Sequence, residues 1–476
     1  MVTQKLINSL KWSAFDKLLF VLIQVLLEII LARLLLPNDY GVFGMVMIVV
    51  VFANVLVDGG LSSALIHYRD RSQSDYAVVF YSSVGIGVLS YLFIYCIAPF
   101  LSNFFKLDIT QYTRIIALSI LFNSVGTLSR TKLSIEMDFK KHTYYSLFSL
   151  LISGAIAIYL AINEYGVISL VLQLVIYSFL FNLLLVYNGR TIPKPYFTKF
   201  SSNRLFGFGS KILSASLLHS VYLSAFPLLL GRFFPASIVG LYTKSNQITT
   251  YPAGLLTSTL QRVLYPYLVN FQNDNKRIYQ FNLNFLKIFS IIVFPIIIWI
   301  IFFADWIIIF IFSERWGDLV LPFKFFVASC ALMPIIILNM NIFQIVGKPN
   351  IYLYAEITSK IVGILLLFFL FRHGFLYVCI GIFLQSIFQF VITSIIAATI
   401  LQAEHLEQLL VIGKIASYNL IILVLTFIVQ YVFQNQFYEF FAIFVLTCIY
   451  GIIISKLYSE EYQFLVQIIR SKISRS

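Results

Sequence analysis

The chain has 476 residues, of which 60% are hydrophobic and 11% are charged, and its mean hydropathy is +0.92. This composition leaves no room for a large soluble domain, because apolar runs of about twenty residues, each long enough to cross a bilayer as a helix, recur from end to end. The net charge of +13 would suggest a nucleic-acid partner in a soluble protein. Here the positive-inside rule accounts for most of it, so we expect no nucleic-acid partner and take the lipid bilayer as the first partner.

The apolar runs predict an all-α polytopic membrane protein with about fourteen transmembrane helices, and twelve spans is the main competing count. Lys and Arg are concentrated in alternate connections and in both terminal segments, which predicts that both termini are cytoplasmic. In chain order the predicted spans are residues 13–36, 40–66, 77–101, 112–135, 144–162, 166–187, 210–232, 239–269, 283–312, 319–346, 351–371, 375–401, 411–433 and 437–457.

The two halves of the chain resemble each other at an offset of 199 residues, at which Arg33 corresponds to Arg232 and Gly41 to Gly240. Six spans separate the copies, so they share one orientation and form a parallel repeat, a plan that places a substrate path between the halves. Both arginines lie at outer helix ends and are interpreted as anchors that snorkel to the interface. The predicted parts are an N-terminal six-helix bundle (1–190), a basic cytoplasmic linker (191–209), a C-terminal six-helix bundle (210–401), and two additional transmembrane helices with a cytoplasmic tail (402–476).

Polar residues recur at helical spacing on one face of the spans 13–36, 40–66, 112–135, 210–232 and 239–269. Charge inside a membrane is expensive, so these faces predict a hydrated cavity, while polar contacts between helices are the alternative for the uncharged residues. Lys211 and Lys244 also lie near enough to a membrane interface for their ammonium groups to snorkel to it. The predicted substrate-binding cations are Lys17, Arg130, Lys211, Lys244 and Arg262, and the predicted charge-balancing or ion-coupling carboxylates are Asp16, Glu28 and Asp58.

The predicted cavity contains both signs of charge but is predominantly basic. Lys and Arg suit a phosphate or diphosphate group, Arg as a planar fork and Lys as a point charge. The carboxylates would neutralise these cations between transport events or bind a coupling ion, H⁺ or Na⁺. The sequence has no P-loop and no His, Cys and carboxylate cluster with metal spacing, so we expect no catalytic residue, no metal and no cofactor.

The segment Leu-Pro-Asn-Asp-Tyr-Gly-Val-Phe-Gly at 36–44, the segment 58–65 and the second-half segments 240–247 and 264–266 resemble the Wzx-type polysaccharide flippases. These belong to the multidrug/oligosaccharidyl-lipid/polysaccharide exporter superfamily. The resemblance implies two six-helix bundles around a central cavity, in some members with two extra C-terminal helices, and alternating access. The family has no universal catalytic motif, so the site residues rest on the polar faces alone.

The cargo that the resemblance implies is an undecaprenyl-diphosphate-linked oligosaccharide repeat unit. It would be flipped from the cytoplasmic to the outer leaflet of the bacterial cytoplasmic (inner) membrane, for O-antigen, capsule or exopolysaccharide synthesis. A polysaccharide polymerase and chain-length machinery are the candidate protein partners.

Two alternatives remain open at this point. An ion-coupled multidrug exporter of the same superfamily would favour an acidic, aromatic pocket, which the basic bias of the polar faces disfavours. A membrane polysaccharide polymerase or ligase would need a sizeable outer loop to present catalytic groups, and the predicted outer connections are short.

Overall fold

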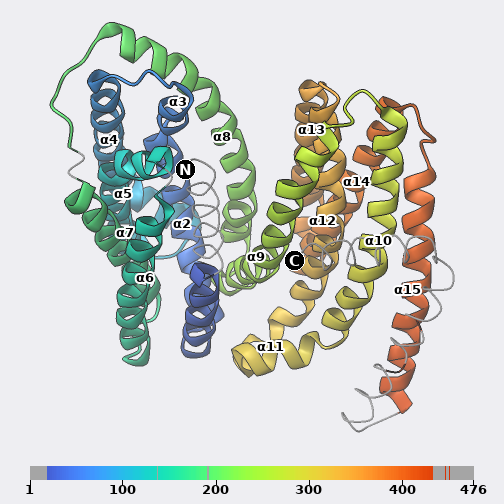
Figure 1. Cartoon of the computed structure of the whole chain (residues 1–476). Coiled ribbons are helices and arrows are strands. Elements are labelled where there is room, and N and C mark those ends of the chain that lie inside the picture. The colour runs from blue at the N-terminus through green and yellow to red at the C-terminus, as the bar shows by residue number, and fades with distance from the viewer. Residues whose placement is uncertain (1–18, 137, 190–191, 433–444, 446–449, 451–476) are drawn as a thin grey trace. The chain divides into compact units, whose positions relative to one another are not determined.

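The computed structural model describes residues 19–136, 138–189, 192–432, 445 and 450, and these residues form helices joined by short connections (Figure 1). Most of the last predicted span, 437–457, lies outside this part of the chain. The elements in order are a helix over 19–34, α2 (Pro37–Asp58), α3 (Leu61–His67), α4 (Gln73–Phe105), α5 (Thr110–Glu136), α6 (Phe139–Ile162), α7 (Val167–Gly189), α8 (Lys199–Phe233), α9 (Ala236–Val269), α10 (Asn275–Phe302), α11 (Ala304–Phe312), a 3₁₀ helix (Glu314–Leu319), α12 (Val320–Ile345), α13 (Pro349–Leu370), a 3₁₀ turn (Phe371–His373), α14 (Phe375–Leu401) and α15 (Glu407–Val432).

Among the described residues, nine helical stretches are long and apolar enough to cross a membrane. The prediction of an all-α, multi-pass membrane protein is therefore confirmed, whereas the count of fourteen spans stays a prediction. The helices α5 and α9 exceed the required length but are not among the nine, because they carry the dense polar faces that the sequence places there. Polar faces of membrane-spanning helices usually face the bundle interior or a water-filled cavity.

The chain divides into two compact units, and α9 passes from the first to the second between Lys244 and Ser245. The first unit also contains the later segment Ile311–Trp316, and the second comprises Ser245–Phe310 and the chain from Gly317 onward. In the first unit α5 packs against α2, α4 and α7, and α7 packs against α6 (Figure 1). One of its apolar cores joins α3, α4, α5 and α8 through Leu61, Leu65, Val79, Leu128 and Leu205.

In the second unit α12 packs against α10, α13 and α14, and α10 packs against α15. A polar cluster crosses this otherwise apolar core. Asn339 accepts a hydrogen bond from Asn282 at 2.8 Å and donates to Ser394 at 3.1 Å and to Gln408 at 3.2 Å. All four residues are fully buried, so amide contacts of this kind tie α10, α12, α14 and α15 together.

The predicted span 40–66 is broken into α2 and α3 at Gly59 and Gly60, whose φ angles are +54° and +68°. Only glycine adopts this left-handed conformation without steric cost. Gly60 also lies directly against the backbone of Gly209 in α8, where a side chain would overlap the Gly209 carbonyl oxygen. The break therefore fixes both the end of α2 at Asp58 and the close approach of α3 to α8.

Gly60→Ala should lower the thermal stability of the purified protein, because its Cβ would meet a carbonyl oxygen and its φ would be unfavourable, together roughly 1–3 kcal/mol. Gly85→Ala in α4 is the matched control, since no atom lies within 4 Å of a Cβ built there. Melting temperatures of both variants in detergent check this. Equal melting temperatures for Gly60→Ala and the wild type would contradict the close contact with α8.

Candidate functional site

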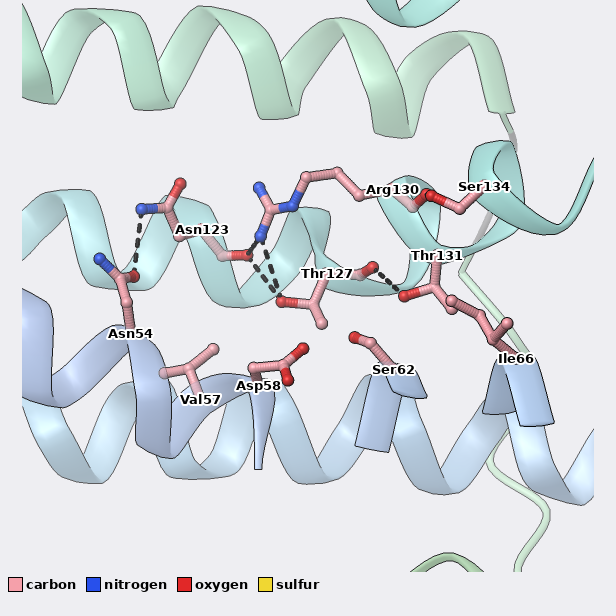
Figure 2. A pocket seen from close by; sticks show the side chains of 10 residues that line it. All are labelled: Asn54, Val57, Asp58, Ser62, Ile66, Asn123, Thr127, Arg130, Thr131 and Ser134. Carbon is pink, nitrogen blue, oxygen red and sulfur yellow. Dashed lines mark hydrogen bonds between the residues drawn. The ribbon is translucent and has the colours of Figure 1, made fainter. Parts of the chain in front are cut away.

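A polar cavity of about 340 Å³ lies in the first unit between α2, α3 and α5 (Figure 2). Eight of its ten lining side chains carry a polar group, which is unusual for a pocket inside a membrane-spanning bundle. The lining residues are Asn54, Val57 and Asp58 from α2, Ser62 and Ile66 from α3, and Asn123, Thr127, Arg130, Thr131 and Ser134 from α5.

Arg130 is the one cation in this lining, and α5 itself holds its guanidinium in place. Side chains of a helix point back toward its N-terminus, so Arg130 reaches the turns that precede it. Its Nη2 donates to the Asn123 carbonyl oxygen at 2.8 Å and to Thr127 Oγ1 at 3.3 Å. Asn123 and Thr127 lie seven and three residues before Arg130, on the polar face that the sequence predicted. The same spacing therefore brings these two acceptors to the guanidinium.

A third acceptor comes from α7, where Asn182 receives a 2.5 Å hydrogen bond from Arg130 Nη1. The Asn182 amide donates in turn to Asn123 Oδ1 at 3.0 Å and to the Ser178 carbonyl oxygen at 2.7 Å. Asn123 then donates to Asn54 Oδ1 at 3.2 Å. A chain of amide groups therefore links α2, α5 and α7 behind the cavity and orients Arg130.

Gly126 makes room for this arrangement. A Cβ built on Gly126 would overlap the Asn182 side-chain oxygen, so any larger residue there would displace the amide that accepts from Arg130. The glycine acts through packing, because α5 is helical on both sides of it.

Asp58 lines the opposite wall, and Figure 2 shows its carboxylate directed toward the α5 face that carries Thr127 and Arg130. The hydrogen-bond acceptors of Arg130 among the described residues are all neutral, so its charge is not neutralised by a directly bonded carboxylate. A guanidinium fixed by neutral acceptors and facing a polar cavity can bind an anionic oxygen through its remaining N–H groups. The arrangement is therefore suited to holding a phosphate-like group, with Asp58 as the nearby counter-charge.

Lys244 and Glu28 lie outside this cavity and form an ion pair of 2.6 Å in the first unit. Lys244 is 1% exposed, which also excludes a snorkelling role in this conformation. Its Nζ lies 4.3 Å from the ring centroid of Tyr40 and 5.5 Å from that of Phe312. Tyr40 also donates to Glu28 Oε2 at 3.3 Å, so the Lys244 charge is enclosed by protein while the Glu28 side chain stays 19% exposed.

The other predicted site residues are not placed in the cavity. Lys211 is exposed on α8 and does not line it. Arg262 belongs to α9 in the second unit, and its side chain is not among those that the structure describes. Asp16 and Lys17 lie outside the described residues. Of the predicted set, the structure brings Arg130 and Asp58 together in one place and Glu28 and Lys244 together in another.

Two residues that matter here were not singled out from the sequence: Asn182 and Gly126. Asn182 follows Ser178 by one helical turn in a mostly apolar helix, which is the weak signal that could have identified it. In the part of the chain that the structure describes, no group of three or more His, Cys, Asp or Glu residues is placed to hold a metal ion.

Gly126→Ala should lower the melting temperature, because Asn182 must move and Arg130 then loses one of its three acceptors. The expected cost is roughly 1–3 kcal/mol. The double variant Gly126→Ala/Asn182→Ala should be at least as stable as Gly126→Ala alone, since the second change removes the overlap. Thermal unfolding of both single variants and the double variant measures this coupling. Strictly additive effects would show that Gly126 and Asn182 do not interact.

Comparison with known proteins gives the same picture for sequence and fold. The teichuronic acid biosynthesis protein TuaB of Bacillus subtilis (strain 168) is 24% identical over 324 residues, which are 66% of each chain. The lipopolysaccharide biosynthesis protein WzxC of Escherichia coli (strain K12) is 21% identical over 67% of this chain and 65% of its own. The matches thus span slightly less than two thirds of these relatives' lengths.

Two solved structures share the fold. A structure titled lipid II flippase MurJ, inward closed conformation, aligns over 95% of this chain and 99% of its own, with a TM-score of 0.74 and 16% identity. An inward-facing multidrug resistance MATE family transporter of the MOP superfamily covers 84% of this chain and 96% of its own, with a TM-score of 0.62 and 14% identity. The fold class expected from the sequence resemblance is thereby confirmed.

A family model described as polysaccharide biosynthesis protein matches residues 30–321, which is more than half of the chain and includes α2, α5, α7 and the whole candidate site. This match confirms the family resemblance that the segments at 36–44 and 240–247 indicated. The chain belongs to the polysaccharide biosynthesis protein family.

Proposed function

We propose that this protein is a flippase that moves undecaprenyl-diphosphate-linked oligosaccharide repeat units from the cytoplasmic to the outer leaflet by alternating access. The observation that carries the proposal is Arg130, oriented by neutral acceptors toward a polar cavity inside a membrane-spanning bundle. A transported lipid with a charged diphosphate needs such a cation, because the bilayer provides no water to solvate the anion.

The lining chemistry matches the parts of this substrate. Arg130 would contact a diphosphate oxygen as a fork, and the amides and hydroxyls of Asn54, Asn123, Thr127 and Ser62 would contact sugar hydroxyls. A volume of about 340 Å³ is enough for the diphosphate and the adjoining sugar. The polyprenyl chain would remain in the bilayer, where its transfer cost is avoided.

The named relatives support the substrate class. Three of them are named for teichuronic acid, lipopolysaccharide or succinoglycan biosynthesis, which are chemically different polysaccharides. The property that we infer to be shared is the lipid carrier with its phosphate groups, which is the part that Arg130 would bind. The sugars would then be contacted by residues that differ between relatives.

We further propose the bacterial cytoplasmic (inner) membrane with both termini cytoplasmic, since the basic connections fall on one side. The six-helix halves 1–190 and 210–401 are proposed to move against each other. Asp58 is proposed to balance Arg130 when no substrate is bound and to take up the coupling ion, H⁺ or Na⁺. The proposed role is transport without catalysis, delivering repeat units to a polysaccharide polymerase and its chain-length machinery.

The first experiment is deletion of the gene in the native host, followed by measurement of the sidedness of lipid-linked oligosaccharide. Accumulation of intact repeat units on the cytoplasmic leaflet with loss of surface polymer supports the flippase. Normal surface polymer with altered drug tolerance would instead identify a multidrug exporter. Units that reach the outer leaflet but stay unpolymerised would identify a polymerase or ligase.

Arg130→Met should abolish surface polymer and Arg130→Lys should retain a small part of it, since a lysine keeps the charge but loses the fork and its orientation. Arg114→Met is the matched control on the same helix, because Arg114 contacts Tyr95 and does not line the cavity. Surface polymer is quantified in the deletion strain complemented with each variant at equal membrane level. Full polymer with Arg130→Met would refute the site.

A further inference from the structure

The two copies of the internal repeat touch each other within the first unit, where α2 meets the beginning of α9. A Cβ on Gly41 would overlap the Ala236 carbonyl oxygen, and one on Gly240 would overlap the Pro37 carbonyl oxygen. Gly41 and Gly240 are 199 residues apart, and so are Pro37 and Ala236. Each contact is therefore repeated by its equivalent, as in a two-fold symmetric helix crossing.

The repeat-equivalent arginines extend this relation. Arg33 Nε donates to the Ile311 carbonyl oxygen at 2.8 Å, and Arg232 Nη1 donates to the Phe104 carbonyl oxygen. Ile311 lies at the end of α11 and Phe104 at the end of α4, and a left-handed residue follows each by two positions, Ser313 with φ +87° and Lys106 with φ +55°. Each arginine thus binds the end of a helix from the opposite half of the sequence.

The two flanks of this crossing differ in chemistry. On one flank the partly buried Glu28 and the buried Lys244 form their ion pair next to Tyr40, and Trp316 Nε1 donates to the Ala32 carbonyl oxygen at 2.7 Å. The equivalent positions on the other flank are apolar, and three of these residues are at most 1% exposed. The pairs, at offsets of 199 and for the last pair 207 residues, are Glu28 with Pro227, Tyr40 with Val239, Lys244 with Met45, and Trp316 with Ile109.

The crossing also lies where the chain passes between its units. The chain leaves the first unit after Lys244, returns at Ile311 and leaves again after Trp316. At each of these three points the chain crosses at, or next to, a residue of the ion-pair flank.

We propose that these contacts form a latch that holds the two halves of the sequence together, on the outer face if both termini are cytoplasmic as proposed above, and that the Glu28–Lys244 flank is the side that releases. Two charges that separate into water recover their hydration, so a buried ion pair costs little to open. The apolar flank has no such compensation and loses its buried area on opening. The inference goes beyond the transported substrate, because it concerns how one face of the protein is closed.

The test uses the full-length protein in cells with Cys96, Cys330, Cys379 and Cys448 replaced and Thr243→Cys as the reporter. Thr243 lies against Gly44 in the crossing, with two side-chain atoms 3.2 Å from a Cβ built there. Labelling by a membrane-impermeant maleimide added outside then measures opening, independently of any cargo. This readout stays informative even if the proposed substrate is wrong.

Two variants should change the labelling rate in opposite directions. Lys244→Met leaves the partly buried Glu28 without its cation and should raise the rate several-fold. Glu28→Met/Lys244→Met makes both flanks apolar and should lower the rate several-fold below the unsubstituted reporter. Glu356→Met/Lys360→Met, which removes the ion pair within α13, is the control and should leave the rate unchanged. Equal labelling of all these proteins would overturn the proposal.

A covalent lock provides the second measurement. A Cβ built on Gly44 lies 3.2 Å from Thr243 Cγ2 and Oγ1, so Gly44→Cys/Thr243→Cys brings the two thiols close enough to test a disulfide. The oxidised protein should lose export of polymer and regain it on reduction, whereas each single cysteine variant should export under both conditions. Undiminished export by the oxidised, cross-linked protein would show that the crossing never opens and would reject the latch.

Discussion

A charged side chain inside a bilayer must find within the protein the partners that water would otherwise provide. This chain satisfies that constraint in two different ways. Arg130 is held by an amide, a carbonyl and a hydroxyl, so its position is fixed while its charge stays available. Lys244 is held by a carboxylate and lies against aromatic rings, so its charge is neutralised within the protein. The first arrangement suits a binding group and the second suits a closed contact.

The second of these arrangements lies at the contact between the two copies of the internal repeat. The two copies share a backbone arrangement. Gly41 and Gly240 make equivalent close contacts, and each repeat-equivalent arginine binds the end of a helix from the other half of the sequence. The copies differ in the polar residues placed on this backbone. The amide-supported cation described here belongs to the first half, and the buried cluster around Asn339 in the second half consists of neutral groups. The buried polar cluster of the second half therefore contributes packing, whereas that of the first half includes a charged group.

Much of this was predictable from the sequence, and the rest depends on contacts between distant segments. Hydropathy and helical spacing predicted the helices and the polar faces of α2 and α5, and the structure brings Asp58 and Arg130 from those faces to one cavity. The ion pair of Glu28 with Lys244 joins residues 216 positions apart, which no local pattern can indicate. Asn182 was missed for the same reason, because a single amide in an apolar helix gains meaning only from the arginine beside it.

The contact between the repeat copies has the symmetry of an interface between two identical subunits, in which every residue meets its own equivalent or a neighbour of it. In such a homodimer one substitution always changes both sides at once, so an acidic residue and a basic residue could not be confined to one flank. Covalent fusion of the two copies removes that restriction, because each codon then specifies a single position. Glu28 facing Lys244, with Pro227 and Met45 at the equivalent places, is an asymmetry that a dimer of two identical copies could not encode.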